Sequence, residues 1–322
     1  MPSRYTVELI DVEEKDGLME RFSDRFLYEE RADIYGCCIK LLTDKREVKM
    51  RWEDNFYKMS SSIRSHGRLV VLDVEGEANR VLYDPLSKTA FLFNIDYYGW
   101  IKSLALSVAG DILEDEHGIY SVHGACIDIG GLGVCLMGAS GSGKTTHAYG
   151  LLRRPEVRVV ADDWIFVRIF EDQVLAYGSE RNFYVRADIA QVWPAFRRFM
   201  ELAEVDEKGR AVINLRWVVG RGRIIPFTTL KVLLILERSG CSSKVVEELS
   251  VSEALRKLRG SGFYNPHLLV RDERKNKLRM QFFERILRLG VKPLLVDTTH
   301  PVEVVHERIV EVLRSMRRSF VL

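Results

Sequence analysis

A glycine-rich segment, Gly138-Ala139-Ser140-Gly141-Ser142-Gly143-Lys144-Thr145, constrains this chain more than any other stretch. It fits the pattern G-x-x-x-x-G-K-[ST] in full, directly after an apolar run and directly before a segment with helical periodicity. The glycines let successive backbone N–H groups face a phosphate, and the following helix adds partial positive charge. Lys144 is expected to reach the β- and γ-phosphates, and Thr145 to offer its hydroxyl to Mg²⁺. We therefore predict a loop that binds ATP and Mg²⁺ and that extends to Thr146.

Two adjacent carboxylates stand one strand after this loop. Asp162 and Asp163 follow the apolar run VRVVA, about seventeen residues beyond Thr145. A carboxylate at a strand end beside a phosphate loop can hold the metal directly or through water. A second carboxylate next to it can accept the proton of an attacking hydroxyl. The alternative is an Asp pair in an ordinary turn or helix cap.

One histidine stands one strand before the loop. His123 lies in the run YSVHGACIDI, and the next run, GVCLMG, leads into the phosphate loop. If the two strands run side by side, the imidazole reaches the γ-phosphate end of the loop. A hydrogen-bonded core histidine is the alternative.

Phosphoryl transfer also calls for a cation that meets the charge building on the transferred group. Arg221 and Arg223 lie in a glycine-containing segment that enters the buried run TTLKVLLILE. Arg223 is the preferred candidate, with a solvated loop arginine as the alternative. Arg181 and Arg186 are weaker candidates.

The secondary-structure patterns divide the chain near residue 96. Residues 1–96 consist mainly of short apolar or alternating runs, REVKMRW among them, which predict strands and a β-rich N-terminal domain. From Tyr97 onward, apolar residues recur at helical spacing, and this helix is expected to end near Gly118. Residues 97–322 form the second predicted domain.

That second domain alternates between predicted strands and predicted helices. One helix is expected from about Ala187 to Ala203, and Ser250 with Glu253 predicts the capped start of another. This alternation predicts an α/β fold with a mixed sheet flanked by helices.

Composition narrows the partners and the compartment. The 322 residues include 48 basic and 46 acidic side chains, so the net charge gives no general case for nucleic acid or a membrane. The basic helices near the C-terminus are expected to be solvated faces, with an RNA-binding surface as the less favoured alternative, and His147 is expected on the surface.

The N-terminal residues are too charged for a signal peptide, which predicts a cytoplasmic protein. A charged fraction of 29%, rich in Arg and Glu, is compatible with a thermophilic source. The five cysteines are expected to be reduced and packed: Cys37, Cys38, Cys126, Cys135 and Cys241.

The blocks HGACIDIGGLGV, GASGSGKTT and VVADDW resemble the catalytic core of the HPr kinase/phosphorylase family, which shares its fold with the phosphoenolpyruvate carboxykinases. The resemblance covers roughly residues 97–170. It implies that Lys144 and the loop amides bind the β- and γ-phosphates, that Thr145 and Asp162 hold Mg²⁺, and that Asp163 is the general base. His123 would lie near the metal or the γ-phosphate. The family also implies a homo-oligomer.

The chain departs from the family pattern in two places. Ala139 stands where HPr kinases have an acidic residue, and GSERNFYVR stands nearest to the glycine-rich segment that engages their protein substrate. Glu180 in that segment is a candidate neighbour of the metal. We therefore predict a kinase that transfers the γ-phosphoryl group to a hydroxyl of a small metabolite or a protein serine. A carboxykinase-like enzyme, a non-catalytic nucleotide switch and an RNA-directed kinase are the alternatives.

Overall fold

The computed structural model describes residues 5–186, 188–206, 209–214, 219–238, 240 and 244–320. These residues form two compact units. The first unit comprises Met1–Ser121, Ser179–Arg181 and Pro266–Lys275, and the second comprises Val122–Gly178, Asn182–Asn265 and Asn276–Leu322. The chain therefore crosses between the units several times. The crossings follow Ser121, inside a strand, and then Gly178, Arg181, Asn265 and Lys275.

The first unit is built on a seven-stranded mixed sheet with the strand order β1-β6-β7-β5-β3-β2-β4. Its strands are β1 Thr6–Leu9, β2 Tyr28–Ile34, β3 Cys37–Thr43, β4 Tyr57–Lys58, β5 Gly67–Leu72, β6 Arg80–Asp84 and β7 Thr89–Phe93. Its helices are α1 Val12–Arg21, α2 Arg46–Asn55 and α3 Tyr98–His117, with a 3-10 turn, η1, at Ser23–Arg25. The sheet belongs to the N-terminal residues, as predicted, but helices account for much of the same region.

The run REVKMRW forms helix α2, so the predicted strand is wrong there. Val48 and Trp52 are four residues apart and are both buried, 6% and 1% exposed. This spacing places both side chains on one face of a helix, and that face can pack against the sheet. Alternation over seven residues did not distinguish this pattern from a strand.

Helix α3 begins and ends close to the predicted residues. It stops at Gly118, which adopts the left-handed conformation at φ 61° that favours glycine. However, α3 belongs to the first compact unit, and the division between the units falls after Ser121 instead of near residue 96. The reason is burial: α3 is buried around most of its circumference, including Asp111 and Glu114, so it forms part of the core of the first unit.

The second unit contains an eight-stranded sheet and a small three-stranded one. Its strands are β8 Tyr120–Ile129, β9 Leu132–Gly138, β10 Val157–Ala161, β11 Trp164–Phe170, β12 Gln173–Tyr177, β13 Phe183–Arg186, β14 Glu204–Val205, β15 Arg210–Ile213, β16 Phe227–Glu237, β17 Val246–Glu248 and β18 Lys292–Asp297. Its helices are α4 Lys144–Leu152, α5 Ile189–Val192, α6 Arg197–Leu202, α8 Val251–Gly260, α9 Glu273–Arg288 and α10 Val302–Phe320, with 3-10 turns η2 Pro194–Phe196, η3 Arg221–Arg223 and η4 Gly262–Tyr264. The first residues of β8 and of α9 belong to the first unit.

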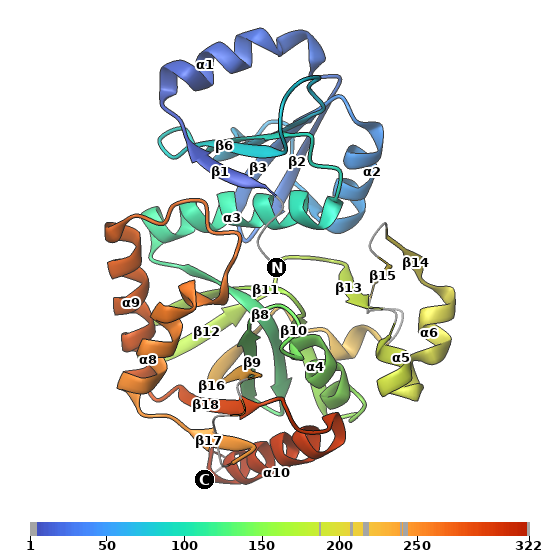
Figure 1. Cartoon of the computed structure of the whole chain (residues 1–322), viewed down its shortest axis with the longest axis vertical. Helices are drawn as coiled ribbons and strands as arrows, with labels where there is room; N and C mark the ends of the chain where they lie inside the picture. Colours follow the sequence, from blue (N-terminus) through green and yellow to red (C-terminus); the bar gives the residue numbers. More distant parts are fainter. Residues whose placement is uncertain are drawn as a thin grey trace. The chain divides into compact units, whose positions relative to one another are not determined.

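Strand β9 lies at the centre of the larger sheet. It pairs antiparallel with β8 and parallel with β16, and β16 pairs parallel with β18. Helix α10 contacts β17, β18 and α4 within this unit (Figure 1). The mixed sheet predicted for the second domain is therefore present.

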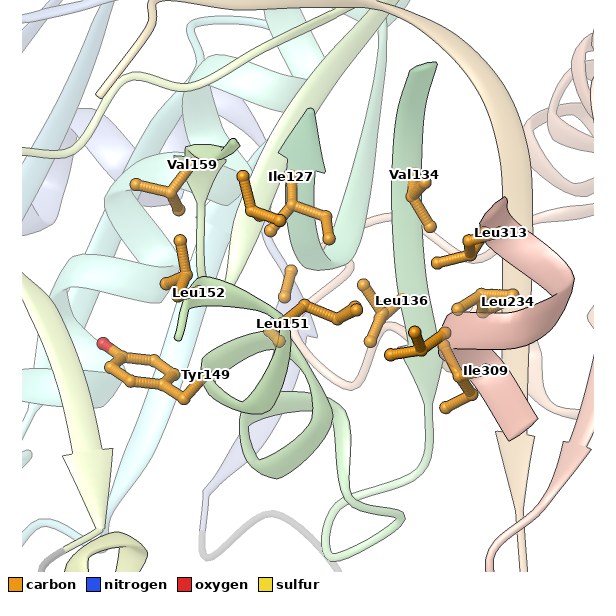
Figure 2. Close-up of a cluster of buried hydrophobic side chains, with 14 of the residues drawn as sticks. Ile127, Val134, Leu136, Tyr149, Leu151, Leu152, Val159, Leu234, Ile309 and Leu313 are labelled. Carbon is orange, nitrogen blue, oxygen red and sulfur yellow. The ribbon is translucent and has the colours of Figure 1, made fainter. Parts of the chain in front are cut away.

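An apolar core joins helix α4 to the sheet. Figure 2 shows side chains from β8, β9, β10 and β16 facing those of α4 and α10. Ile127, Leu136 and Leu234 are each at most 1% exposed. Burying an aliphatic side chain of this size stabilises a fold by roughly 1.5 to 3 kcal/mol. The core therefore fixes the helix that follows the glycine-rich loop.

The helix predicted from Ala187 to Ala203 is interrupted. Helix α5 ends at Val192, a 3-10 turn begins at Pro194, and α6 begins at Arg197. Proline has no N–H group for the helical hydrogen bond, so the helix stops before it. Ala187 lies outside the described residues.

Four of the five cysteines are free and buried, as predicted: Cys37, Cys38, Cys126 and Cys135. Burial raises the pKa of the Cys37 and Cys135 thiols to about 12, so both stay protonated and unreactive near neutral pH. Cys241 lies outside the described residues. Among the helices in the described ranges, none combines the length and the apolar character that a bilayer crossing requires.

Candidate active site

Three predicted elements meet at one edge of the large sheet. Strand β9 ends at Gly138, and the neighbouring β8 begins at the same edge because Gly124 pairs with Met137. Strand β10 ends there too, since Ala161 pairs with Cys126. The glycine-rich loop, His123 and the Asp pair therefore leave the sheet from one edge, as the order of the strands predicted.

The loop has the predicted strand–loop–helix context. Gly141 and Gly143 adopt positive φ values of 81° and 95°, a conformation that glycine tolerates without steric cost. At Gly138 a side chain would collide with the backbone, since an added Cβ would lie 2.4 Å from the carbonyl oxygen of Leu236. These positions need glycine to form a loop whose amides can face an anion.

Lys144 is the first residue of α4 and is 9% exposed. Its Nζ donates hydrogen bonds to the carbonyl oxygens of Gly138, at 2.8 Å, and Ala139, at 3.2 Å. Burial lowers the pKa of Lys144, and the nearby carboxylate of Asp163 acts in the opposite direction. The loop lysine and Asp163 are thus within electrostatic reach of each other, which is the grouping that the sequence predicted.

His123 and Asp163 form a pair. The imidazole Nε2 lies 3.1 Å from Oδ1 of Asp163, and the amide of Gly124 donates to the carbonyl oxygen of Asp163 at 2.8 Å. The other ring nitrogen, Nδ1, lies 3.1 Å from the carbonyl oxygen of Tyr264. A carbonyl oxygen only accepts hydrogen bonds, so Nδ1 is the donor and Nε2 is the nitrogen that faces the carboxylate.

Asp162 is 7% exposed and lies within electrostatic reach of Tyr149 in α4. Burial raises the pKa of the Tyr149 phenol well above its usual value, and the carboxylate of Asp162 adds to this effect. Asp162 and the hydroxyl of Thr145 supply oxygen donors, which Mg²⁺ prefers. Among the described residues, no three His, Cys, Asp or Glu side chains form a metal cluster by themselves. The donor set suits an ion that arrives with a nucleotide, because such ions use one or two carboxylates together with phosphate oxygens.

Arg223 does not lie where the sequence predicted. Its guanidinium donates to the carbonyl oxygens of Leu152 at 2.6 Å, of Arg154 at 2.7 Å and of Val157 at 2.8 Å. These carbonyls belong to the C-terminal end of α4 and the turn after it, whereas the glycine-rich loop precedes the N-terminal end of that helix. A cation at a helix C-terminus satisfies otherwise unpaired carbonyls. The catalytic role predicted for Arg223 is therefore wrong, and Arg223 is a helix cap.

This assignment makes Arg223→Met a test. We expect a loss of about 1 to 3 kcal/mol in the free energy of unfolding, because buried carbonyl groups lose their donor. The matched control is Arg221→Met, which changes an exposed residue of the same turn and should cost less than about 0.5 kcal/mol. Urea unfolding measures both. A loss of phosphoryl transfer of about a hundredfold in folded Arg223→Met would restore the catalytic role.

The remaining charged candidates belong to the first unit or cannot be assigned. Glu180 forms an ion pair with Lys102 at 2.8 Å, and both side chains are at most 6% exposed. Arg181 donates to the carbonyl oxygen of Glu53 at 3.3 Å. Neither contact involves the glycine-rich loop. The side chain of Arg186 lies outside the described part of the chain.

Two histidines lie behind the loop instead of on the surface. His147 of α4 is 2% exposed, and its ring stacks on that of His306 of α10 at 6.0 Å between centroids and 7° between planes. Trp193 packs against His306 at 4.9 Å and donates from Nε1 to the carbonyl oxygen of Thr146 at 2.8 Å. A Cβ added to Gly143 would lie 3.3 Å from the His147 ring. The pair thus supports the loop from the interior, and the predicted surface position of His147 is wrong.

The two histidines predict a pH-dependent stability. Burial, with the other imidazole, lowers the pKa of His147 from 6.5 to about 4; burial, with Arg153 and Arg154, does the same for His306. Between about pH 4 and 6.5 the unfolded chain binds protons that the folded chain rejects. Stability is therefore complete above pH 6.5 and falls as the pH decreases toward 4, by on the order of 2 kcal/mol for His306.

Urea unfolding at pH 5 and at pH 7 measures this dependence. His306→Gln should reduce the difference between the two pH values, whereas the exposed His300→Gln should leave it unchanged. A wild-type unfolding free energy that is equal at both pH values would contradict the prediction.

Sequence reasoning missed one further contact in the site. The group that faces Nδ1 of His123 is a backbone carbonyl, 141 residues away along the chain, and any residue type carries such a group. A weak signal existed on both sides of Tyr264, since the dipeptides Ser261-Gly262 and Asn265-Pro266 are typical of turns.

Comparison with known proteins adds a family match. Residues 118–278 match the family described as the HPr serine kinase C-terminal domain. The HPr kinase/phosphorylase of Shouchella clausii is 31% identical over 120 residues, which are 37% of this chain and 32% of that protein. The ATP-dependent phosphoenolpyruvate carboxykinase of Aeropyrum pernix is 32% identical over 133 residues, with coverage of 37% and 26%. A solved structure of the HPr(Ser) kinase/phosphatase from Coxiella burnetii matches at 13% identity and a TM-score of 0.38, over 62% of this chain and 92% of that one. The chain spans about a third of the length of the first curated relatives.

Proposed function

The chain belongs to the family of the HPr serine kinase C-terminal domain, and from this premise we propose that it is an ATP- and Mg²⁺-dependent kinase that phosphorylates a hydroxyl group. A protein serine is the favoured acceptor, because residues 118–278, which contain the loop and the Asp pair, match the HPr serine kinase C-terminal domain, and relatives named HPr kinase/phosphorylase are 31% identical over part of this chain. The observation that carries the proposal is the grouping of Lys144, Asp163 and His123 at one sheet edge.

Each residue has a role in this reaction. The loop amides and Lys144 hold the β- and γ-phosphates and balance their charge. Asp163 accepts the proton of the acceptor hydroxyl as its oxygen forms a bond to the γ-phosphorus and the bond to the bridging oxygen of ADP breaks. Nε2 of His123 lies 3.1 Å from Oδ1 of Asp163, where the neutral ring can share the proton that Asp163 accepts. The products are the phosphorylated acceptor, ADP and one proton.

Thr145 and Asp162 are the residues that would hold Mg²⁺. When bound with the nucleotide, the ion supplies positive charge to the phosphate oxygens as negative charge develops.

A carboxykinase activity is the second candidate. The match to a phosphoenolpyruvate carboxykinase and the carboxykinase-like string SGSGKTT favour it. Nucleotide-dependent release of CO₂ from oxaloacetate would identify this activity.

Transfer of label from γ-labelled ATP tests the proposed function. Purified protein is incubated with Mg²⁺ and HPr, or with fractionated proteins and metabolites, and the labelled species is identified. Lys144→Met should lower transfer by about 10² to 10³-fold, as the loss of one charge-stabilising donor does, whereas the exposed Lys277→Met should not change it. Tight ATP binding without labelling of any acceptor would support a non-catalytic nucleotide switch and overturn the kinase.

A further inference from the structure

We infer that the turn η4, Gly262–Tyr264, is a positioning element for the proposed proton acceptor. Through its Tyr264 carbonyl oxygen, η4 holds Nδ1 of His123 in the protonated form, so that Nε2 always faces Asp163. This inference rests on the proposed function, because the importance of the His123–Asp163 pair follows from it. Tyr264 is therefore assigned a positioning role and not a catalytic one.

The backbone of this turn is unusual. Gly262, Phe263 and Tyr264 have φ values of 59°, 58° and 54°, so three consecutive residues are left-handed. Glycine adopts this conformation freely, but aromatic residues adopt it at a steric cost. Such a conformation persists only where the surroundings hold it in place, and such residues concentrate at functional sites.

The side chains of Phe263 and Tyr264 hold the turn in place. The phenol of Tyr264 donates to Oε1 of Glu237, and Nζ of Lys257 donates to Oε2 of the same carboxylate at 2.7 Å. Glu237 is the last residue of β16, whose Leu236 pairs with Gly138 at the start of the glycine-rich loop. Phe263 is 6% exposed and stacks on Phe283 at 5.7 Å between centroids. The turn is thus anchored to the strand that also supports the loop.

The chemistry of the carbonyl explains what this anchoring achieves. A neutral imidazole carries its proton on either nitrogen, and in each of the two tautomers the other nitrogen has the lone pair that can accept a proton. With Nδ1 donating to Tyr264, the neutral ring can only expose its lone pair at Nε2. Nε2 lies 3.1 Å from Oδ1 of Asp163, so this lone pair is placed to share the proton that Asp163 accepts. Without the carbonyl, the ring could rotate away from Asp163, or carry its proton on Nε2, which could then no longer take up a proton from the carboxyl group.

Nitrogen-15 NMR of the imidazole, combined with steady-state kinetics, tests the inference on the full-length chain. In the wild type we expect Nδ1 of His123 to be protonated in both the neutral and the charged form of the ring. In Asn265→Pro, the residue before the new proline is driven toward extended backbone, which moves the Tyr264 carbonyl away. We expect Nδ1 to lose its fixed proton and kcat to fall about 10²-fold, with the KM for ATP unchanged.

Asn265→Ala is the matched control, because it removes the same buried side chain without restricting Tyr264. It should keep the wild-type NMR signature and most of kcat. If Asn265→Pro does not fold, Tyr264→Phe replaces it: loss of the bond to Glu237 should give a mixture of tautomers and a fall in kcat of several-fold.

Two results would overturn the inference: a neutral wild-type ring with an unprotonated Nδ1, or a folded Asn265→Pro variant with wild-type tautomer and kcat. The NMR result does not depend on activity. An inactive wild type with a protonated Nδ1 would therefore reject the proposed kinase but support the positioning of His123.

Discussion

Asp163→Asn is expected to lower kcat for phosphoryl transfer by about 10²- to 10⁴-fold, the contribution of a well-placed general base. The amide is nearly isosteric with the carboxylate but cannot accept the proton of the acceptor hydroxyl. It also places a neutral group next to Nε2 of His123, which now lies 3.1 Å from a carboxylate oxygen. The affinity for ATP should change by less than about threefold, because the proposed reaction assigns phosphate binding to the loop amides and Lys144 and not to Asp163. Single-turnover kinetics with labelled ATP, together with equilibrium nucleotide binding, separates the two effects.

Asp172→Asn is the control for this change. Asp172 is exposed in the turn between β11 and β12, so the same chemical substitution there should leave both kcat and binding unchanged. An Asp163→Asn variant with wild-type turnover would remove Asp163 from the mechanism.

Lys275→Met is expected to lower the free energy of unfolding by about 3 to 5 kcal/mol, because it leaves buried carboxylates without their main partner. Lys275 is fully buried, and its Nζ lies 2.7 Å from Asp111, 2.9 Å from Asp115 and 3.4 Å from Glu114. Burial alone would lower the pKa of Lys275, but the surrounding carboxylates outweigh it and the pKa is raised. The basic helix was predicted to be a solvated face, and at this residue that prediction is wrong.

Urea unfolding measures the loss, and Lys292→Met is the matched control. Lys292 pairs with Glu248 at 3.2 Å, and both side chains are about half exposed. Such a surface pair contributes at most about 1 kcal/mol. If Lys275→Met cost no more than the control, the other cations near the cluster, Lys88 among them, would be sufficient to balance its charge.

The sequence predicted those parts of the site that local chain geometry determines. The loop, its strand and its helix follow one another directly, so the pattern at Gly138–Thr145 carries its own structural context. The placement of His123 required one more step, that the consecutive strands β8 and β9 pair, as they do. Asp163 joins them because β10 pairs with β8 instead of with β9, the strand before it in the sequence. The position predicted for Arg223 was wrong for a physical reason. The segment that leads into a strand can lie near either end of a neighbouring helix, and no residue pattern specifies which end.

Other features depend on tertiary contacts that no local pattern contains. The few apolar residues of α2 fit the spacing of a helix and also that of a strand. Only the burial of Val48 and Trp52 on one helix face distinguishes the two structures. The burial of His147 depends on Trp193 and His306, which are far away along the chain. The group of Tyr264 that contacts His123 is a backbone carbonyl, which every residue type carries, so the residue type cannot reveal it. Long-range packing, in each case, decided the outcome.

Two crossings of the chain between its compact units lie close in sequence to the hydrogen bond that orients His123. One crossing follows Ser121, two residues before His123, and another follows Asn265, one residue after Tyr264. The hydrogen bond from the imidazole of His123 to the Tyr264 carbonyl therefore joins two residues that each stand next to a crossing. Each residue contributes two soft backbone torsions, so only a few torsions determine where this imidazole lies. A misplacement of about an ångström at a catalytic group costs about 10²-fold in rate, which makes the torsions of these few residues the ones to which a reaction at His123 is most sensitive.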